Sequence, residues 1–210
     1  VKEYRFLGIQ TPEPSHGLFR GFDDRLVSRL SHMLPGLDIV SYDMEKLVES
    51  VWVSATKIQQ ELNNAIVLST CAEFASARRG HTIEINRIVG ADGKIIGLGP
   101  RPGSNSLAKQ IKGFAKIAEG QQVVVVEDGI FTGSTLCDLL ERLQRESVDV
   151  VAVVVGLCFP KAKERILQQF HGQLIVINEI DDIYEWMPDH DFLPFVPNCG
   201  RIIGGNFGGQ

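Results

Sequence analysis

The chain has 210 residues, of which 21 are Lys or Arg and 26 are Asp or Glu, for a formal net charge of −5 at pH 7. This length suits a single globular domain. The acidic balance argues against a nucleic-acid partner, because contacts with a phosphate backbone normally need a basic surface. Hydrophobic residues make up 44% and charged residues 22% of the chain, a composition that excludes a disordered or fibrous protein.

The sequence carries no sign of a membrane segment or of a disulfide framework. No apolar run reaches the roughly 18 to 20 residues needed to span a bilayer. The four cysteines are spread along the chain without a Cys-x-x-Cys pair, at Cys71, Cys137, Cys158 and Cys199. This spacing favours reduced thiols over disulfides. We therefore expect a folded protein of the cytoplasm.

The first part of the chain is predicted to be mainly helical. A short strand is expected near residues 4–9, followed by amphipathic helices over residues 22–33 and 44–62. Apolar residues in both helices recur at spacings of three and four, which no strand would show. We expect one domain over residues 1–210.

The core of that domain is predicted to span about residues 60–180. Residues 1–59 and 181–210 are expected to be appended helical and hood segments around it.

Four short runs in the core are apolar at nearly every position. They cover residues 65–68, 123–126, 150–155 and 174–177. Runs of this kind are typical of strands buried on both faces in a parallel sheet. Amphipathic helical patterns separate or follow the later runs, over residues 105–118, 134–146 and 161–170. This order predicts an α/β fold with three layers, a mostly parallel central sheet flanked by helices.

A different pattern lies between the first and second apolar runs. Two β-rich segments, residues 82–89 and 94–98, are separated by an Asp-Gly step, which is a hairpin signal. The following residues 97–104 are rich in glycine and proline and include Arg101. They suit either a mobile loop over a ligand or an ordinary surface connection. Our hypothesis takes residues 90–106 as a closing loop.

The most informative segment is residues 123–135, Val-Val-Val-Val-Glu-Asp-Gly-Ile-Phe-Thr-Gly-Ser-Thr. A buried strand brings Glu127 and Asp128 to its carboxyl end, where ligands bind in open α/β sheets. A turn containing Gly133 then opens a helix whose first N–H groups and dipole favour an anion. Hydroxyl donors follow at Thr132, Ser134 and Thr135. Since carboxylates accept hydrogen bonds from sugar hydroxyls, the segment predicts a site for a phosphorylated ribose.

This segment resembles the 5-phosphoribosyl 1-pyrophosphate (PRPP) signature of type I phosphoribosyltransferases. That signature is four apolar residues, an acidic pair, four variable positions ending in Thr or Ser, and Gly-x-Thr. In the family the acidic pair holds the ribose hydroxyls and the loop holds the 5-phosphate. The resemblance implies PRPP-binding roles for Glu127, Asp128, Gly129, Ile130, Phe131, Thr132, Gly133, Ser134 and Thr135.

The activity that the resemblance implies is transfer of a 5-phosphoribosyl group from PRPP to a nitrogenous base, with release of pyrophosphate. Magnesium is implied as a cofactor that arrives with PRPP, without direct metal ligands from the protein. Asp128 and Arg101 are the catalytic residues that we assign. Lys109 and Lys112 are the other cations nearby in sequence that could stabilise the departing pyrophosphate.

Two positions depart from the family pattern. Gly129 stands where an aliphatic residue is customary. Phe131 stands where hypoxanthine-type members carry an aspartate thought to act on the base, which argues against the usual hypoxanthine–guanine chemistry. The alternative interpretation of the segment is a generic strand and helix with solvated carboxylates. The joint match of spacing and residue types argues against that alternative.

Outside the signature the resemblance is one of layout over residues 60–180. It implies a pyrophosphate-binding loop after the first core strand, where we assign Ser69, Thr70 and Cys71, with Lys109 as a further contact. Glu73 in the same loop would disfavour pyrophosphate.

The terminal segment from residue 181 onward is rich in aromatic residues. Because family members often stack the base on an aromatic of a terminal segment, we assign base binding to Trp186 and Phe192. The alternative is that these aromatics pack the tail onto the core.

Two function hypotheses follow, an enzyme and a binding protein. The second is a non-catalytic PRPP- or nucleotide-binding regulatory protein of the same fold, favoured by the irregular pyrophosphate loop and by Phe131. A Rossmann-type nucleotide binder is disfavoured because neither G-x-G-x-x-G nor G-x-x-x-x-G-K-[ST] occurs. The expected partners are PRPP and a nitrogenous base, without nucleic acid or membrane. The sequence leaves the oligomeric state open, with a homodimer as one option.

Overall fold

The structure is a computed structural model of the chain. It describes residues 5–6, 9–10, 22–39, 42, 44–62, 65–70, 80–89, 95–101, 103–181 and 202–203. The chain divides into two compact units, one formed by Val1–Asp43 with Tyr184–Gly200 and the other by Met44–Ile183 with Arg201–Gln210. That all 210 residues form one domain stays a prediction.

Among its described residues, the first unit contains two short strands and one helix. β1 (Arg5–Phe6) and β2 (Ile9–Gln10) pair in antiparallel fashion, where the sequence predicted one strand. α1 (Phe22–Met33) confirms the first amphipathic helix.

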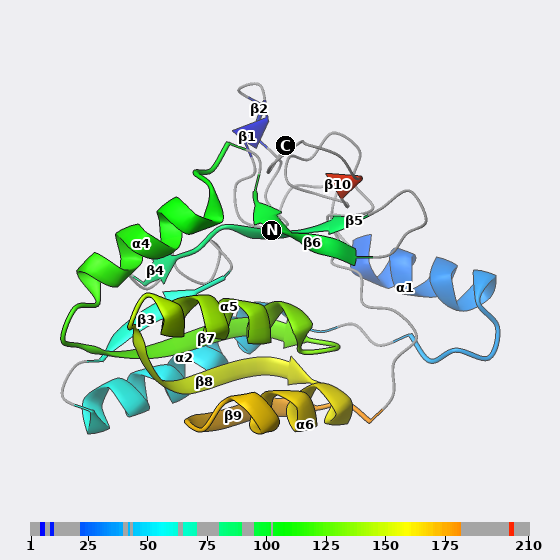
Figure 1. The fold of residues 1–210 in the computed structure, drawn as a ribbon. Helices are drawn as coiled ribbons and strands as arrows, with labels where there is room; N and C mark the ends of the chain where they lie inside the picture. The colour runs from blue at the N-terminus through cyan, green and yellow to red at the C-terminus, as the bar shows by residue number, and fades with distance from the viewer. Residues whose placement is uncertain are drawn as a thin grey trace. The chain divides into compact units, whose positions relative to one another are not determined.

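The central sheet of the second unit has five parallel strands in the order β4-β3-β7-β8-β9 (Figure 1). The strands are β3 (Ile66–Ser69), β4 (His81–Thr82), β7 (Gln122–Ile130), β8 (Asp149–Cys158) and β9 (Gln173–Glu179). The four apolar runs are therefore confirmed as core strands, and the predicted α/β fold with a parallel sheet is confirmed with them. The sequence did not predict β4, because this two-residue strand has no apolar run of its own.

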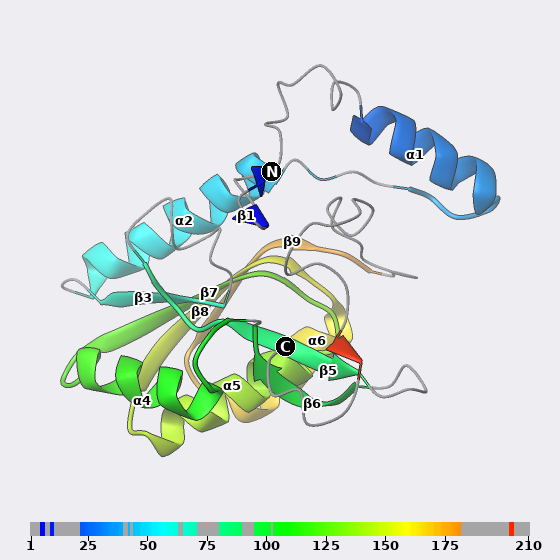
Figure 2. The same cartoon turned by 90° about the horizontal axis from the view of Figure 1, so that it is seen from above.

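Helices cover both faces of this sheet (Figure 2). They are α2 (Met44–Glu61), α4 (Leu107–Ile117), α5 (Ser134–Arg145) and α6 (Pro160–Gln169). On one face, Val51 and Ala55 of α2 pack in a cluster with Val124 and Val126 of β7, among other residues. Helix α2 thus contributes to the core of this unit. The predicted core boundary near residue 60 stays a prediction.

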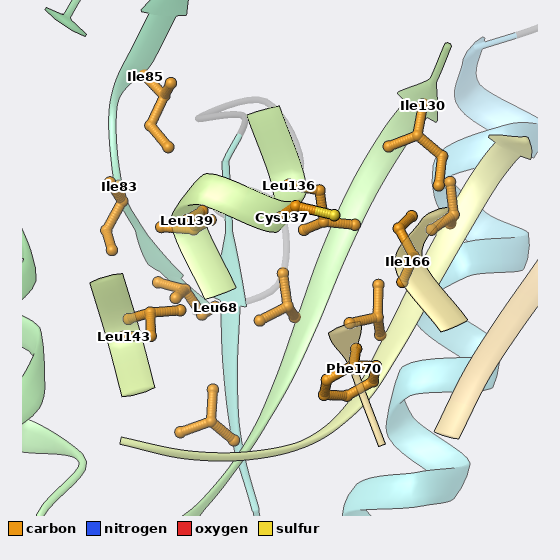
Figure 3. Packing of buried hydrophobic residues seen from close by; sticks show 14 of the residues in the cluster. Leu68, Ile83, Ile85, Ile130, Leu136, Cys137, Leu139, Leu143, Ile166 and Phe170 are labelled. Carbon is orange, nitrogen blue, oxygen red and sulfur yellow. The ribbon is translucent and has the colours of Figure 1, made fainter. Parts of the chain in front are cut away.

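The larger core cluster lies on the opposite face, under α4, α5 and α6 (Figure 3). Leu136, Leu139 and Leu143 form the apolar stripe of α5, and each is at most 1% exposed. They pack with residues of the sheet and of α6, including Leu68 and Ile166. This packing holds the first turn of α5 at the carboxyl end of β7.

The predicted hairpin is confirmed. β5 (Ile85–Val89) and β6 (Ile95–Pro100) pair in antiparallel fashion, and β10 (Ile202–Ile203) adds to β5 in parallel. The interpretation of residues 97–100 as loop was wrong, because pairing with β5 continues through Pro100. Residues 90–94 and Pro102 lie outside the described residues, so the closing loop over the remainder of 90–106 stays a prediction.

Two further findings concern the membrane segment and the disulfides that the sequence argues against. No helix in the described part of the chain has both the length and the apolar character needed to cross a membrane. Cys137 and Cys158 are buried free thiols, as predicted. Cys71 and Cys199 lie outside the described residues.

Candidate functional site

The acidic pair lies inside β7. The strand runs to Ile130, four residues beyond the predicted end at residue 126. Glu127 and Gly129 pair with Val155 and Leu157 of β8, so the pairing of the strands fixes the backbone of the acidic pair. The backbone N–H of Gly129 donates to Oδ1 of Asp128 at 2.8 Å.

The end of the first core strand meets the acidic pair. Ser69 of β3 pairs with Val126 of β7, which places the next residues of both segments side by side. The Thr70 hydroxyl donates to Oε2 of Glu127. Two segments that the sequence linked to one ligand therefore come together. Ser69 is fully buried, Cys71 lies outside the described residues, and the pyrophosphate role assigned to this segment stays a prediction.

Two arginines of the hairpin region act on the same carboxylate. Arg87 lies on β5, and Arg101 follows β6. Burial raises the pKa of Glu127 well above its ordinary value, and the charge of Asp128 raises it further, while the charges of Arg101 and Arg87 oppose this rise. Glu127 is thus a carboxyl group that holds its proton more tightly than a solvated one.

The backbone and the side chain of Glu84 hold Arg101 in place. The Arg101 N–H donates to the Glu84 carbonyl at 3.1 Å, and Arg101 Nε lies 3.4 Å from Glu84 Oε2. Gln110 of α4 fixes Glu84 in turn: its Oε1 accepts from Glu84 N at 2.8 Å and its Nε2 donates to Glu84 O at 3.3 Å. Through Glu84 and Gln110, the predicted catalytic cation Arg101 is therefore linked to helix α4.

Sequence reasoning missed Arg87, Glu84 and Gln110. Each looks like an ordinary polar residue of a strand or a helix surface. The alternation of β5, with Arg87 opposite Leu98 in the hairpin register, could have suggested which face Arg87 occupies. It could not have shown that the hairpin approaches β7.

The loop between β7 and α5 requires glycine at its last position. Gly133 caps α5 with a φ of +72°, a left-handed conformation that glycine adopts without steric cost. A Cβ on Gly133 would also lie 3.1 Å from the Ala162 carbonyl oxygen of α6. Both constraints exclude a larger residue at this position.

The first turn of α5 is suited to an anion. Its N-cap is Gly133, which has no side chain to cap the helix, and the backbone N–H of Ser134 donates to the Thr132 hydroxyl at 3.4 Å. The dipole of the helix favours an anion at this end. The exposed hydroxyls of Thr132 and Ser134 share a hydrogen bond of 2.9 Å. Thr135 follows in the same turn. Phosphate binding by these groups stays a prediction, and residues 131–135 are called the phosphate loop below on the basis of that prediction.

Helix α6 and its N-cap residue Phe159 contact this loop. Arg165 Nη1 donates to the Thr132 carbonyl at 3.0 Å. The ring of Phe131 stacks on Phe159, with centroids 5.1 Å apart and an interplanar angle of 26°. Phe131 therefore has a packing partner in the fold, which accounts for an aromatic at this position.

For the remaining predicted site residues, the structure gives at most their burial or exposure. Ile130 is buried in the larger core cluster. Lys109 and Lys112 are exposed on α4, and their assigned roles stay predictions. Trp186 and Phe192 lie outside the described residues. In the part of the chain that is described, no group of three or more His, Cys, Asp or Glu side chains could hold a metal ion.

Comparison with curated proteins gives three informative matches. The chain is 33% identical over 70 residues to orotate phosphoribosyltransferase of Streptococcus thermophilus, covering 32% of each protein. It is 36% identical over 64 residues to the Streptococcus mutans enzyme of that name, covering 30% of each. The Streptococcus pneumoniae enzyme is 27% identical over 95 residues, or 44% of each. The matches thus span less than half of these relatives.

Over these segments the chain is similar to phosphoribosyltransferases. No family model matches the chain. Among solved structures, adenine phosphoribosyltransferase of Rhodothermus marinus has a TM-score of 0.44 at 12% identity, covering 75% of this chain and 99% of that one. Hypoxanthine phosphoribosyltransferase of Staphylococcus aureus has a TM-score of 0.45 at 18% identity, covering 72% and 82%. The names of these proteins differ in the base, so they indicate no subfamily.

Proposed function

We propose that this chain transfers the 5-phosphoribosyl group of PRPP to a nitrogenous base and releases pyrophosphate. One observation carries the proposal. Glu127 of the signature accepts a hydrogen bond from Thr70, which follows the first core strand, and the charge of Arg101 acts on the same carboxyl group. Three segments that the family resemblance assigns to one ligand thus converge at the carboxyl end of β7, the edge where open α/β sheets bind ligands.

The proposed arrangement divides the ligand among these groups. The phosphate loop holds the 5-phosphate, and Asp128 with Glu127 accepts hydrogen bonds from the ribose hydroxyls. Arg101 lies on the hairpin side, where its charge would favour the departing pyrophosphate. A ring nitrogen of the base attacks the anomeric carbon, and the bond from that carbon to pyrophosphate oxygen breaks with its electron pair leaving on pyrophosphate. The rate enhancement comes from the positioning of the two reactants and from electrostatic stabilisation of the departing pyrophosphate.

Magnesium would arrive with the phosphates of PRPP, as Mg²⁺ typically does. The carboxyl groups of Glu127 and Asp128 are then left for the ribose hydroxyls and are not direct ligands of the metal. When bound, it would neutralise charge on the pyrophosphate. The carboxylates would orient the ribose beside it.

The test is an assay of pyrophosphate release from PRPP and magnesium with a panel of bases. Orotate is the first acceptor to try, because the curated relatives are orotate phosphoribosyltransferases. We expect release with one acceptor and none in the same mixture without a base. Hypoxanthine is the acceptor expected to fail, since Phe131 replaces the aspartate of hypoxanthine-type members and stacks on Phe159.

A second candidate is a regulatory protein that binds PRPP without turnover. The engagement of the Thr70 hydroxyl with Glu127 favours it, because this hydroxyl is then turned to the acidic pair and not to pyrophosphate. PRPP binding without pyrophosphate release for any base would support this candidate over the enzyme. The cytoplasmic location and the homodimer stay predictions under either function.

A further inference from the structure

The phosphate loop has a supporting partner that the signature does not contain, which is the α6 helix. Three contacts join α6 and its N-cap to the loop. They are the hydrogen bond from Arg165 to the Thr132 carbonyl, the stacking of Phe131 on Phe159, and the close approach of Gly133 to Ala162. The contacts fall on three successive loop residues, so α6 holds the loop along its length.

The contact from Arg165 has a directional consequence. A trans peptide holds its C=O and its N–H in one plane, pointing in opposite directions. The peptide that joins Thr132 to Gly133 has its carbonyl fixed towards α6 by the guanidinium at 3.0 Å. The N–H of Gly133 must therefore point away from α6. It is the first backbone donor ahead of the α5 first turn.

The charge of Arg165 also acts on the first turn of α5. Its guanidinium opposes the burial-driven rise in the pKa of Cys137, which lies in the first turn of α5. Within the described ranges, the ion pairs of the structure involve other cations and none includes Arg165. A hydrogen bond to a charged donor is about twice as strong as a neutral one, and it polarises the peptide so that the opposite N–H becomes a better donor.

We propose that Arg165 is a positioning residue of the phosphate loop: by holding the Thr132 carbonyl on the α6 side, it aims the Gly133 N–H at the 5-phosphate of the ligand. This inference rests on the proposed function, because the ligand is PRPP. The inference adds Arg165 to the residues of the signature. Arg165 lies 30 positions after Thr135, and it tunes binding of the phosphomonoester end of PRPP without touching the pyrophosphate end.

The test compares three ligands on four proteins by titration calorimetry with magnesium present. The ligands are PRPP, ribose 5-phosphate and pyrophosphate. The proteins are wild type, Arg165→Gln, Arg165→Lys and the control Arg145→Gln, which removes an exposed arginine from the far end of α5. Arg165→Gln should bind PRPP and ribose 5-phosphate about tenfold more weakly and pyrophosphate as wild type does. Arg165→Lys should recover part of the loss, and Arg145→Gln should match wild type.

The outcomes separate the inference from the function. Wild type that fails to bind PRPP overturns the proposed function and this inference with it. Unchanged PRPP affinity in Arg165→Gln, or an equal loss for all three ligands, overturns the positioning role alone. Should Arg165→Gln not fold, Arg165→Lys takes its place, with a smaller loss confined to the two phosphomonoesters expected and a uniform or absent loss counting against the role.

Discussion

At the scale of single residues, Asp128 and Thr135 belong to the two halves of the proposed site. Asp128 already accepts one backbone hydrogen bond from Gly129, which orients its carboxylate. We expect Asp128→Asn and Thr135→Val each to weaken PRPP binding by about 1–3 kcal/mol. The first change replaces a charged acceptor oxygen by an amide donor, and the second removes a hydroxyl. Calorimetry measures the loss.

A matched control for these variants is Asp138→Asn. Asp138 lies on α5 and pairs with Arg142 at 2.8 Å, so the change removes an equal charge away from the acidic pair. PRPP affinity should stay at the wild-type value. Wild-type affinity in both site variants would remove the ribose and phosphate assignments.

The raised pKa of Glu127 predicts a dependence of stability on pH. Because the folded-state pKa lies above the ordinary value of 4.5, between these two values the native state binds a proton that the unfolded state has lost. The free energy of unfolding therefore falls as pH rises through this window and levels off above the folded-state pKa. Glu127→Gln keeps an oxygen acceptor for Thr70 without a charge, so it should flatten this fall and be more stable than wild type at neutral pH.

Urea unfolding from pH 5 to pH 8 measures this effect. Glu141→Gln is the control, since Glu141 is exposed and pairs with Arg145, and its curve should run parallel to that of wild type. If the Glu127→Gln curve is also parallel to wild type, the pKa of the partly buried Glu127 carboxyl is not raised as described.

At the scale of elements, the site depends on how closely β7 and β8 approach. A Cβ on Gly156 of β8 would lie 2.5 Å from the Asp128 carbonyl oxygen and 2.9 Å from Cγ of Leu47 on α2. Gly156→Ala should therefore destabilise the protein by about 1–3 kcal/mol, as overpacking does. It should also weaken PRPP binding, because the strain falls on the backbone of Asp128.

Gly113→Ala is the contrasting change. Gly113 is exposed within α4, and a Cβ there would meet nothing within 4 Å. Alanine is favoured over glycine in a helix interior by about 0.5–1 kcal/mol, so this variant should melt higher than wild type. Thermal unfolding of the two variants, with shifts of opposite sign expected, checks the strand contact. A Gly156→Ala protein as stable as wild type would contradict it.

The elements that the sequence predicted are those whose signal is local. Periodic apolar residues were sufficient for α2, α5 and the four core strands, because a buried face constrains every third, fourth or adjacent position. β4 and β10 were missed because two-residue strands form only where a neighbouring strand offers hydrogen bonds. Residues 97–100 were misjudged because β5 pairs with them despite their turn-forming composition.

The same reasoning explains which parts of the site were predictable. The acidic pair and the glycine turn are contiguous, and their spacing shows in the sequence. Arg165, Gln110 and Glu84 act through contacts between elements, over sequence separations that no local pattern records. Thr70 was predicted near the ligand by layout, but its bond to Glu127 depends on the register of β3 against β7.

At the scale of the whole molecule, the proposed function pairs an acidic chain with a ligand that is itself anionic. The net charge of −5 opposes the approach of PRPP at long range. Binding therefore requires local compensation. The α5 N-terminus and Arg165 supply it at one end of the proposed ligand, and Arg101 supplies it beside Glu127, whose neighbour Asp128 adds to the negative charge.

This balance predicts that PRPP stabilises the fold only when magnesium is present. At a PRPP concentration 100 times Kd, binding should add about 2.7 kcal/mol to the free energy of unfolding. For a chain of this size, that corresponds to a rise in Tm of about 5–10 °C. Differential scanning fluorimetry measures Tm with PRPP and magnesium, with PRPP and EDTA, and with EDTA alone. The sample with EDTA alone gives the reference Tm for the sample with PRPP and EDTA. An equal shift with PRPP and EDTA would show that arginines and the helix terminus suffice to neutralise the ligand, and magnesium would then have no part in binding.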